Sequence, residues 1–438
     1  MYSASPACGD GTVTLPSGFN PQPCTIMGVD RNLRTPYVSK WNLDLQHAIT
    51  KDLSIDIAYV GNHGTKLVGL TDLNQPQLVN GFSPGWGNPA IPTSPAGLCI
   101  ASAPKFDKCS PDTAAEQAAR PFASKFPYLS YINWLSNNNM SNYHGLQLSM
   151  TQRTSHGVSF VLGYTYAHAL AMSPDNWRFI NPINANNVRD LYGSSEFDVR
   201  HRLTYSLTYA IPTLKAPAQL LQGWSINSIV SVQSGLPWGV NDTTTDFSGT
   251  GEINAQNSSG ERWNLLGNPE DFKTTKALID TNDGSGGIPY FPGTSNANCL
   301  AKAQAAGPLA VASLTNLGCY TSGASVLVPP AYGSYGTLGR NVFRSMPYYN
   351  WDLSVMKASK FKEHYTAQFR AEFFNILNHP NISNPFGGPG GDNSFTDPSA
   401  AAGASFGFRS ETPDVTSSNP VLGSGGHRAI QLGLKIIF

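Results

Sequence analysis

Strict alternation of apolar and polar residues over segments of about eleven residues is the feature that most restricts how this chain folds. Alternation with a period of two puts successive side chains on opposite faces of a β-strand. In 363–374, for example, Phe369 and Phe373 fall on one face, and Arg370 and Glu372 fall on the other. Nine segments show this pattern: 40–50, 53–62, 143–153, 158–168, 200–211, 224–234, 348–358, 363–374 and 428–438. The pattern predicts an all-β fold.

The links between these segments alternate between short and long. The short links are 51–52, 154–157, 212–223 and 359–362, and the long links are 63–142, 169–199, 235–347 and 375–427. Transmembrane β-barrels have short turns on the periplasmic side and longer loops outside. A strand of about eleven residues, rising about 3.3 Å per residue and tilted by about 45°, also spans roughly the 25 Å of such a barrel's apolar band. We therefore expect an antiparallel transmembrane β-barrel with long extracellular loops.

Tyrosine and tryptophan residues occur near the ends of the predicted strands. These residue types are enriched at both membrane–water interfaces, where one end of the ring is apolar and the other is wet. We expect interfacial girdles that include Trp41, Tyr59, Tyr143, Tyr166, Trp224, Tyr348, Tyr349 and Trp351. In the alternative interpretation, these aromatic side chains form the core of a soluble β-sandwich.

The composition agrees with a protein of strands, turns and long loops. Charged residues make up 13% of the chain, against about 25% in an average soluble domain. The 28 basic and 28 acidic residues give a formal net charge of zero, and no basic run is present that could neutralise a phosphate backbone. No apolar run approaches the roughly 18 residues of a membrane helix. We therefore expect no nucleic-acid partner, and we expect any membrane crossing to use strands.

The six cysteines fall into three local pairs: Cys8 with Cys24, Cys99 with Cys109, and Cys299 with Cys319. Pairing between near neighbours within three loop-like segments is the simplest of the connectivities that six cysteines allow. Disulfides would indicate an oxidising compartment. The alternative is six unrelated free thiols. A zinc site is not expected, because no closely spaced CxxC motif is present.

Sequence motifs for catalysis are absent or weak. The chain contains no HExxH, GxSxG or P-loop motif. Asp198, Arg200 and His201 lie close together next to a strand start, which could suggest acid–base chemistry, but a polar contact in the barrel wall or a loop is the favoured interpretation. We therefore predict that the chain is not an enzyme and has no catalytic residues, no cofactor and no metal.

Several longer motifs carry a resemblance to a known family. They are WNLDLQHAITKDLSIDIAYVGNHG (41–64), NYHGLQLSMTQR (142–153), FDVRHRLTY (197–205), GWSINSIVSVQSGLP (223–237), LGRNVFRSMPYYNWDL (338–353) and FRAEFFNILNHP (369–380). With these motifs and the terminal Phe438, nearly the whole chain resembles the barrel domain of TonB-dependent transporters of the Oar-like group.

The resemblance implies a barrel of about 22 strands that is closed by an N-terminal plug, with a TonB-contacting segment ahead of the plug. The nine predicted strands would be the last nine of that barrel. The resemblance also implies that alternating apolar residues ending on an aromatic form the signal for the outer-membrane insertion machinery: Ile430, Leu432, Leu434, Ile436 and Phe438.

Parts of that plan have no counterpart in the sequence. No basic n-region and no apolar h-region of an export signal follow Met1, and no plug, TonB-contacting segment or earlier strands are recognisable. We expect residues 1–39 to be the remnant of an extracellular loop and residues 40–438 to be the C-terminal part of the barrel. Unpaired strand edges in lipid would leave backbone groups unsatisfied, so we expect a fragment that is inactive alone.

The expected partners follow from this plan. They are outer-membrane lipid, the missing N-terminal strands and plug, the insertion machinery and, through the missing segment only, TonB. Arg370 and Glu372 lie on the polar face, which lines the lumen of a barrel, and we expect them to contact the plug rather than the substrate. The expected function is energy-dependent uptake of a large organic substrate across the outer membrane. The alternatives are a non-transporting adhesive or structural barrel and a soluble, secreted, β-rich binding module.

Overall fold

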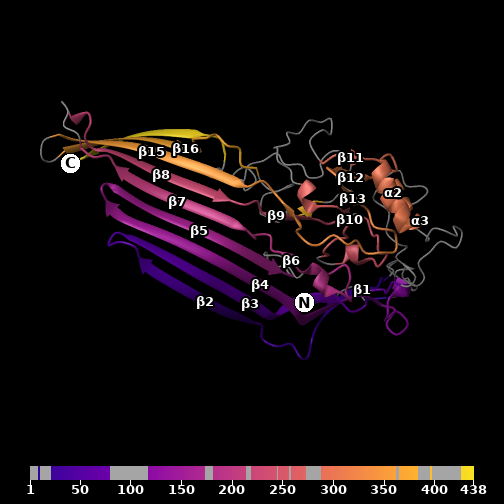
Figure 1. Cartoon of the computed structure of the whole chain (residues 1–438). Helices are drawn as coiled ribbons and strands as arrows, with labels where there is room; N and C mark the ends of the chain where they lie inside the picture. The colour runs from indigo at the N-terminus through magenta and orange to yellow at the C-terminus, as the bar shows by residue number, and fades with distance from the viewer. Residues whose placement is uncertain are drawn as a thin grey trace.

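Antiparallel strands that follow one another in chain order make up the main sheet (Figure 1). The computed structural model describes residues 8–9, 21–78, 117–172, 181–213, 219–243, 245–255, 258–272, 288–361, 365–382, 395–396 and 426–438. The long strands among these residues are β2 (Tyr37–Ala48), β3 (Leu53–Asp72), β4 (Leu129–Ser155), β5 (Val158–Ala171), β7 (His201–Ala210), β8 (Trp224–Gln233), β15 (Tyr348–Phe361), β16 (Tyr365–Phe374) and β18 (Ala429–Ile437). Their order in the sheet is β18-β16-β15-β8-β7-β5-β4-β3-β2, so each predicted segment coincides largely with one of these strands.

Two strands continue well beyond the predicted segments 53–62 and 143–153. β3 and β4 remain paired along much of what the sequence suggested was a loop, as far as Asp72 opposite Asn133. Asparagine side chains bond to the neighbouring strand there: Asn138 Nδ2 donates to Thr71 Oγ1 at 2.7 Å, and Asn139 Nδ2 donates to Val68 O at 3.1 Å. The extension carries polar residues on both faces, so apolar–polar alternation could not reveal it.

Two short strands join the same sheet at its loop end. β1 (Cys24–Val29) pairs in parallel with β4, and β6 (Gly193–Ser194) pairs with β5. β1 lies within residues 1–39, for which the sequence suggested loop structure only.

The register of the sheet places most apolar residues of the nine long strands on one face, although Val161 and Ile229 lie on the other. Residues directly opposite each other in an antiparallel pair share a face. Tyr205 lies opposite Leu162 on one side and Val230 on the other, and Phe369 lies opposite Leu434. The described part of the chain leaves this face uncovered; Leu434, for example, is 72% exposed. A continuous uncovered apolar face is what a lipid-facing barrel wall requires.

The same register places most of the predicted interfacial aromatics on this apolar face. Trp41, Tyr59, Tyr166, Trp224, Tyr349 and Trp351 share it. Tyr143 and Tyr348 do not, because they lie opposite Asn62 and Gln233 on the polar face. The prediction of a girdle role for Tyr143 and Tyr348 is therefore wrong; nearness to a strand end does not determine the face.

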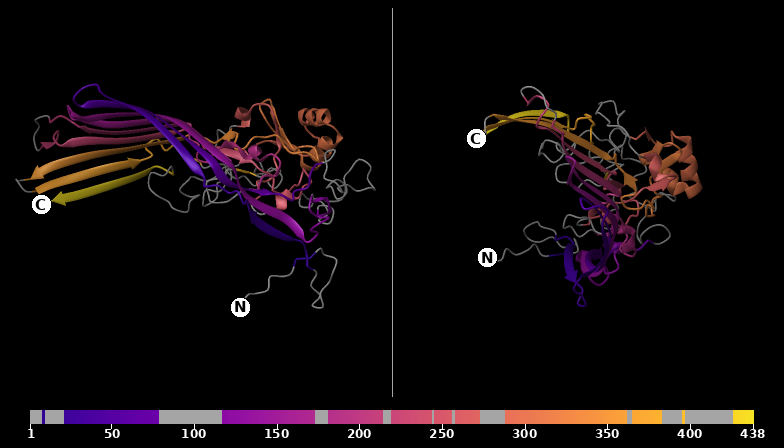
Figure 2. Two further views of the ribbon diagram at one scale, coloured as in Figure 1. Left: turned by 90° about the horizontal axis from the view of Figure 1, so that it is seen from below. Right: turned by 60° about the vertical axis from the view of Figure 1, so that its left-hand side comes forward.

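A folded unit occupies the longest link of the chain, and we call residues 237–344 the loop subdomain. Figure 2 shows it at one end of the long strands, away from the C-terminus. Its elements are β9 (Pro237–Val240), η3 (Glu252–Asn254), β10 (Asn264–Leu266), η4 (Pro269–Phe272), β11 (Tyr290–Phe291), α2 (Ala297–Ala306), α3 (Pro308–Leu317), β12 (Cys319–Ser322), β13 (Ser325–Val328) and β14 (Phe343–Arg344). The order of its four-stranded sheet is β10-β13-β12-β11. β14 and β9 form a three-stranded sheet with β17 (Phe395–Thr396). In the link before β7, η1 (Val188–Leu191) adds one more short helix.

Large aromatic side chains hold the loop subdomain together. Trp238, Phe247, Trp263, Tyr320 and Phe343 are each at most 1% exposed and belong to one cluster. Burying a large aromatic side chain stabilises a fold by roughly 1.5–3 kcal/mol. This cluster makes the loop subdomain a packed structure, whereas the sequence suggested only irregular loop here.

Disulfides join two of the three local cysteine pairs. Cys8 is bonded to Cys24, and Cys299 is bonded to Cys319. The second bond ties α2 to β12 inside the loop subdomain. Cys99 and Cys109 lie outside the described residues. In the part of the chain that is described, no helix is long and apolar enough to cross a membrane.

Four buried carboxyl groups lie in the loop subdomain: Asp242, Asp246, Glu252 and Glu261 are each at most 1% exposed. Glu261 Oε1 accepts a hydrogen bond from Ser248 N at 3.0 Å. Burial, together with the negative charges of Asp246 and Asp242, raises the pKa of Glu261 well above its usual range. The folded loop subdomain therefore keeps a proton on Glu261 at a pH at which the unfolded chain has lost it.

We expect Leu207→Lys to reduce the folded fraction in the membrane strongly, and Ser206→Lys to have little effect. Leu207 lies on the apolar face opposite Phe160, and Ser206 is its neighbour on the polar face. A lysine near the middle of the lipid-facing side destabilises a barrel by about 2–4 kcal/mol. The measurement is protease resistance of the protein in outer-membrane fractions. Equal losses for both variants would contradict the assignment of the faces.

We expect the loop subdomain to lose stability as the pH rises from the usual pKa of a glutamate, about 4.3, to the raised pKa of Glu261. In that window the folded state binds more protons than the unfolded state, so the free energy of unfolding falls with pH. Glu261→Gln should remove this fall. Hydrogen exchange of peptides covering 258–272 measures it, with the exposed Glu270→Gln as the control. A Glu261→Gln variant that retains the full pH dependence would refute the assignment.

Candidate functional site

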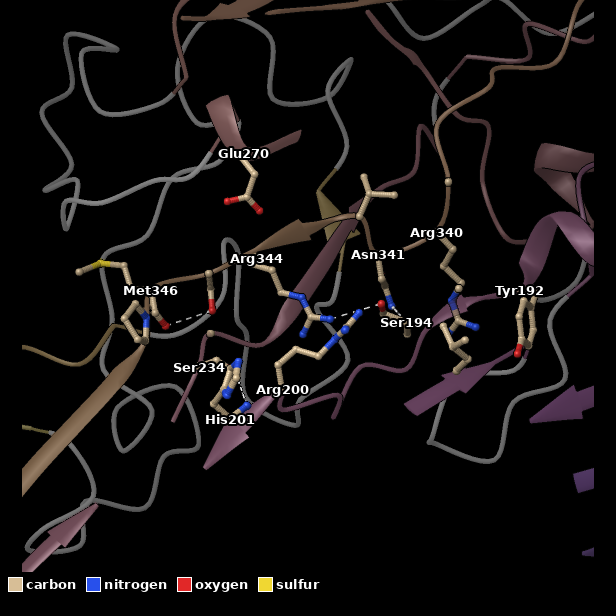
Figure 3. A pocket seen from close by; sticks show the side chains of 17 residues that line it. Tyr192, Ser194, Arg200, His201, Ser234, Glu270, Arg340, Asn341, Arg344 and Met346 are labelled. Carbon is tan, nitrogen blue, oxygen red and sulfur yellow. Dashed lines mark hydrogen bonds between the residues drawn. The ribbon is translucent and has the colours of Figure 1, made fainter. Parts of the chain in front are cut away.

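A cavity of about 1000 Å³ lies where the ends of several long strands meet the loop subdomain (Figure 3). β5 and β7 contribute Leu170 and His201, and Arg200 immediately precedes β7. Arg344 of β14 and Glu270 of η4 come from the loop subdomain. The cavity therefore combines residues that are far apart in the sequence.

Asp198 is the buried centre of a charged network beside this cavity. It is 1% exposed, and its Oδ2 lies 3.1 Å from both His168 Nδ1 and Arg200 Nε. Arg344 Nη2 donates to the same oxygen, while Ala169 N donates to Oδ1 at 2.7 Å. Burial by itself would raise the pKa of Asp198, but the hydrogen bonds and positive charge of Arg344, with the bonds from Ala169 and His168, lower it overall.

A second ion pair fixes the wall of the cavity. Arg340 Nη2 donates to Glu196 Oε1, and Arg340 Nη1 donates to the carbonyl oxygens of Ala171 at 3.1 Å and Leu191 at 3.3 Å. Asn341 Nδ2 donates to Ser194 O at 2.9 Å. These bonds attach the segment before β14 to the ends of β5 and β6. Arg340 is largely committed to this structural role.

Arg200 and Arg344 present their guanidinium groups side by side, as Figure 3 shows. The side chain of Arg200 is 35% exposed and that of Arg344 is 17% exposed. Arg200 Nη2 also lies 3.1 Å from His168 Nε2. Two guanidinium groups thus share one buried carboxylate, and such planar groups can bind carboxylate or phosphate oxygens through paired N–H donors.

The three clustered residues noticed in the sequence have separate roles. Asp198 and Arg200 are bonded to each other, but His201 bonds to Tyr164 through Nδ1 at 2.8 Å. Nothing in this arrangement places a nucleophile beside a base. Sequence reasoning missed Arg344 and His168 as members of the network. Arg344 lies inside the motif 338–353, which was noticed only for its resemblance.

Arg370 and Glu372 lie on the polar face, as their positions in the alternation predict. Arg370 Nη1 lies 3.9 Å from Glu372 Oε1, with half of the arginine side chain exposed. Both residues line a shallow hollow of about 420 Å³, together with Asp352 and Asn227. A role in contacting a plug is not tested by this geometry and stays a prediction.

The apolar residues of the predicted insertion signal lie on the outermost strand of the sheet. β18 pairs with β16 on one side, and no other described strand pairs with it. Its residues Ile430, Leu432, Leu434 and Ile436 share the apolar face and are between 59% and 72% exposed. Phe438 follows the end of β18 and is 91% exposed. Their role in insertion stays a prediction.

Comparison with protein families gives the class of protein. The model of a family described as outer membrane beta barrel domain matches residues 4–412. Among solved structures, the chain is similar to the outer membrane transporter YddB from Escherichia coli, with 9% identity and a TM-score of 0.36. That alignment covers 95% of this chain and 34% of YddB, so the chain spans about a third of that transporter. A search of the curated proteins found no match.

We expect Asp198→Asn to loosen the contact between the strand ends and the loop subdomain. Removing the shared carboxylate leaves two neighbouring positive charges, and breaking a buried ion pair destabilises by up to about 3–5 kcal/mol. Solvent around Arg200 reduces this effect. Hydrogen exchange at the Ala169 amide should become faster.

Asp190→Asn is the matched control, because Asp190 is 45% exposed and pairs with Arg262 at 3.6 Å.

The pH dependence gives a second readout. Because the pKa of Asp198 is lowered in the folded state, its stabilisation is present above the usual value near about 4 and is lost as the pH falls through the lowered pKa. Asp198→Asn should lack this acid-dependent loss. Equal exchange rates at Ala169 in the two variants would contradict the central role of Asp198.

Proposed function

The chain belongs to the outer membrane β-barrel domain family, and we propose that it forms the C-terminal part of the barrel of a TonB-dependent transporter. The family places the protein in the outer membrane. The transport function, the dependence on TonB and the size of the complete barrel are parts of the proposal.

The observation that carries the proposal is the open sheet with one apolar face. β2 and β18 are its outermost long strands, and neither pairs with the other in the described part of the chain. In lipid each edge would leave N–H and C=O groups without partners. We propose that both edges pair with further strands, which complete a barrel of about 22 strands, and that the insertion machinery acts on β18 and Phe438.

The polar face supports a wide lumen rather than a filled core. Asp44, Asp56, Arg370 and Glu372 lie on this face, where no second layer of the described chain covers them. A barrel of about 22 strands encloses a lumen that can hold a plug. We propose that Arg370 and Glu372 contact this plug, and that movement of the plug by TonB admits a large organic substrate.

A second candidate function is surface binding without transport. The disulfide-bonded loop subdomain has its own aromatic core and lies at the loop end of the strands, so a rigid surface is available for an adhesive or structural barrel. The soluble, secreted module considered from the sequence is the weakest alternative, because the family is one of outer-membrane proteins.

We expect loss of the gene and loss of TonB to abolish uptake of the same substrate. The measurement follows a panel of radiolabelled oligosaccharides and peptides, each too large for porins, in wild-type cells, in cells lacking the gene and in cells lacking TonB. Cells that carry the gene with the Leu207→Lys change, which lowers the folded fraction in the membrane, show the effect of lost assembly alone. If the protein reaches the outer membrane but no panel member depends on its gene, the surface-binding function is favoured instead.

A further inference from the structure

The charged cavity lies at the edge of the lipid-facing surface. Tyr164, Tyr166, His168 and Leu170 are alternate residues of β5 and therefore share a face. Tyr166 lies opposite His201 of β7, on the face that carries the apolar side chains of the whole sheet. The face that meets lipid further along β5 thus leads directly to His168 and Leu170, which adjoin the cavity.

An aromatic belt marks the boundary between the lipid-facing surface and the cavity. The rings of Tyr166 and His201 are 5.0 Å apart, and Tyr164 bonds to His201. On the neighbouring strands, Tyr59 bonds to His144 Nδ1 at 2.8 Å. Aromatic rings with a polar edge gather at the level of lipid headgroups. The cavity begins at this level, where lipid phosphates lie.

The charges of the cavity favour an anion on one wall. Arg340 is matched by Glu196, whereas Arg200 and Arg344 share Asp198 alone. On this wall two arginines therefore face one carboxylate, and Arg200 Nη1 donates no hydrogen bond to any described residue. Charge-assisted bonds from two adjacent guanidinium groups fit a phosphate.

The opposite wall favours a hydrogen-bond donor. Glu270 lines the cavity from η4, and its carboxylate faces the arginine side in Figure 3. The carboxylate of Glu270 repels an anion, whereas it can accept a hydrogen bond from a hydroxyl or ammonium group. Leu170, Val342, Met346 and Pro347 add an apolar lining. A ligand that matches all three features has a phosphate, a nearby donor and an apolar part.

We propose that this cavity binds the headgroup of an outer-membrane phospholipid. Its phosphate lies on Arg200 and Arg344, its hydroxyl or ammonium group points to Glu270, and its glycerol and first acyl carbons contact the apolar lining. The proposal requires the apolar face to meet lipid, but it does not require the protein to transport anything. Purified protein tests it without any measurement of uptake.

The first test uses protein purified from outer membranes in non-ionic detergent. Titration calorimetry measures the binding of dihexanoyl phosphatidylethanolamine, with dihexanoylglycerol as the probe that lacks phosphate and phosphoethanolamine as the probe that lacks acyl chains. We expect phosphatidylethanolamine to bind at least about tenfold more tightly than either, because each of the other two probes lacks one set of contacts with the cavity, and a tenfold difference in affinity corresponds to about 1.4 kcal/mol.

Variants connect this binding to the cavity. Arg200→Gln should weaken the binding of phosphatidylethanolamine about tenfold or more, while Arg202→Gln should not change it. Arg202 is the matched control, because it lies only two residues from Arg200, in β7, but lines a different hollow. Asp198 keeps Arg344 as a partner in Arg200→Gln, so the network retains an ion pair.

A third variant keeps the test valid if Arg200→Gln does not fold. Glu270→Gln should weaken the binding of phosphatidylethanolamine and strengthen that of dihexanoyl phosphatidic acid, which has no ammonium group. Phosphoethanolamine that binds as tightly as the lipid would overturn the lipid proposal in favour of a soluble phosphate ester. Equal affinities of the wild type, Arg200→Gln and Glu270→Gln for the lipid would refute the site itself.

Discussion

Hydrogen bonding between neighbouring strands is the interaction on which the rest of the structure depends. Lipid offers no partner to a backbone N–H or C=O group, so a strand in a membrane must bond to strands on both sides. Pairing each strand with its neighbours in the chain meets this demand, and the order β18-β16-β15-β8-β7-β5-β4-β3-β2 follows. Register then becomes decisive, because a slip of one residue would turn every apolar side chain of a strand to the polar face.

The sequence predicted this sheet well because alternation and register express the same physical demand. A strand between lipid and a polar lumen must alternate, and alternation has few other causes over eleven residues. Alternation no longer predicts a strand where the strand does not separate lipid from a polar lumen. The extensions of β3 and β4 have polar residues on both faces, and asparagine side chains such as Asn138 and Asn139 bond across them instead. Tyr143 and Tyr348 show a second limit of the sequence prediction. Their residue type and their positions near strand ends suggested a membrane interface, but the register turns them to the polar face.

The loop subdomain and the charged cavity were beyond prediction for a different reason. The contacts that define them join residues far apart in the chain: Arg344 and Asp198 are separated by 146 positions, and Trp238 packs on Phe343 with ring centroids 4.7 Å apart. No local pattern records such pairs. α2 is rich in alanine and α3 is apolar over most of its length, so neither shows the separate apolar and polar faces that predict a helix from sequence. Asp198 and Arg200 were visible as neighbours, but their partners Arg344 and His168 were not.

The sheet and the loop subdomain also depend on each other. β8 ends at Gln233 and β15 begins at Tyr348, and these two residues are directly paired, so the loop subdomain leaves and re-enters the sheet between adjacent strands. A flexible link would satisfy that closure equally well. The chain instead places Arg340 shortly before β14 and Arg344 within it, and bonds them to Glu196 and Asp198, which precede β7. These ion pairs hold the subdomain against the strand ends in one orientation. The same geometry leaves Arg200 partly exposed above the aromatic belt, so the arrangement that stabilises the junction also creates its charged surface.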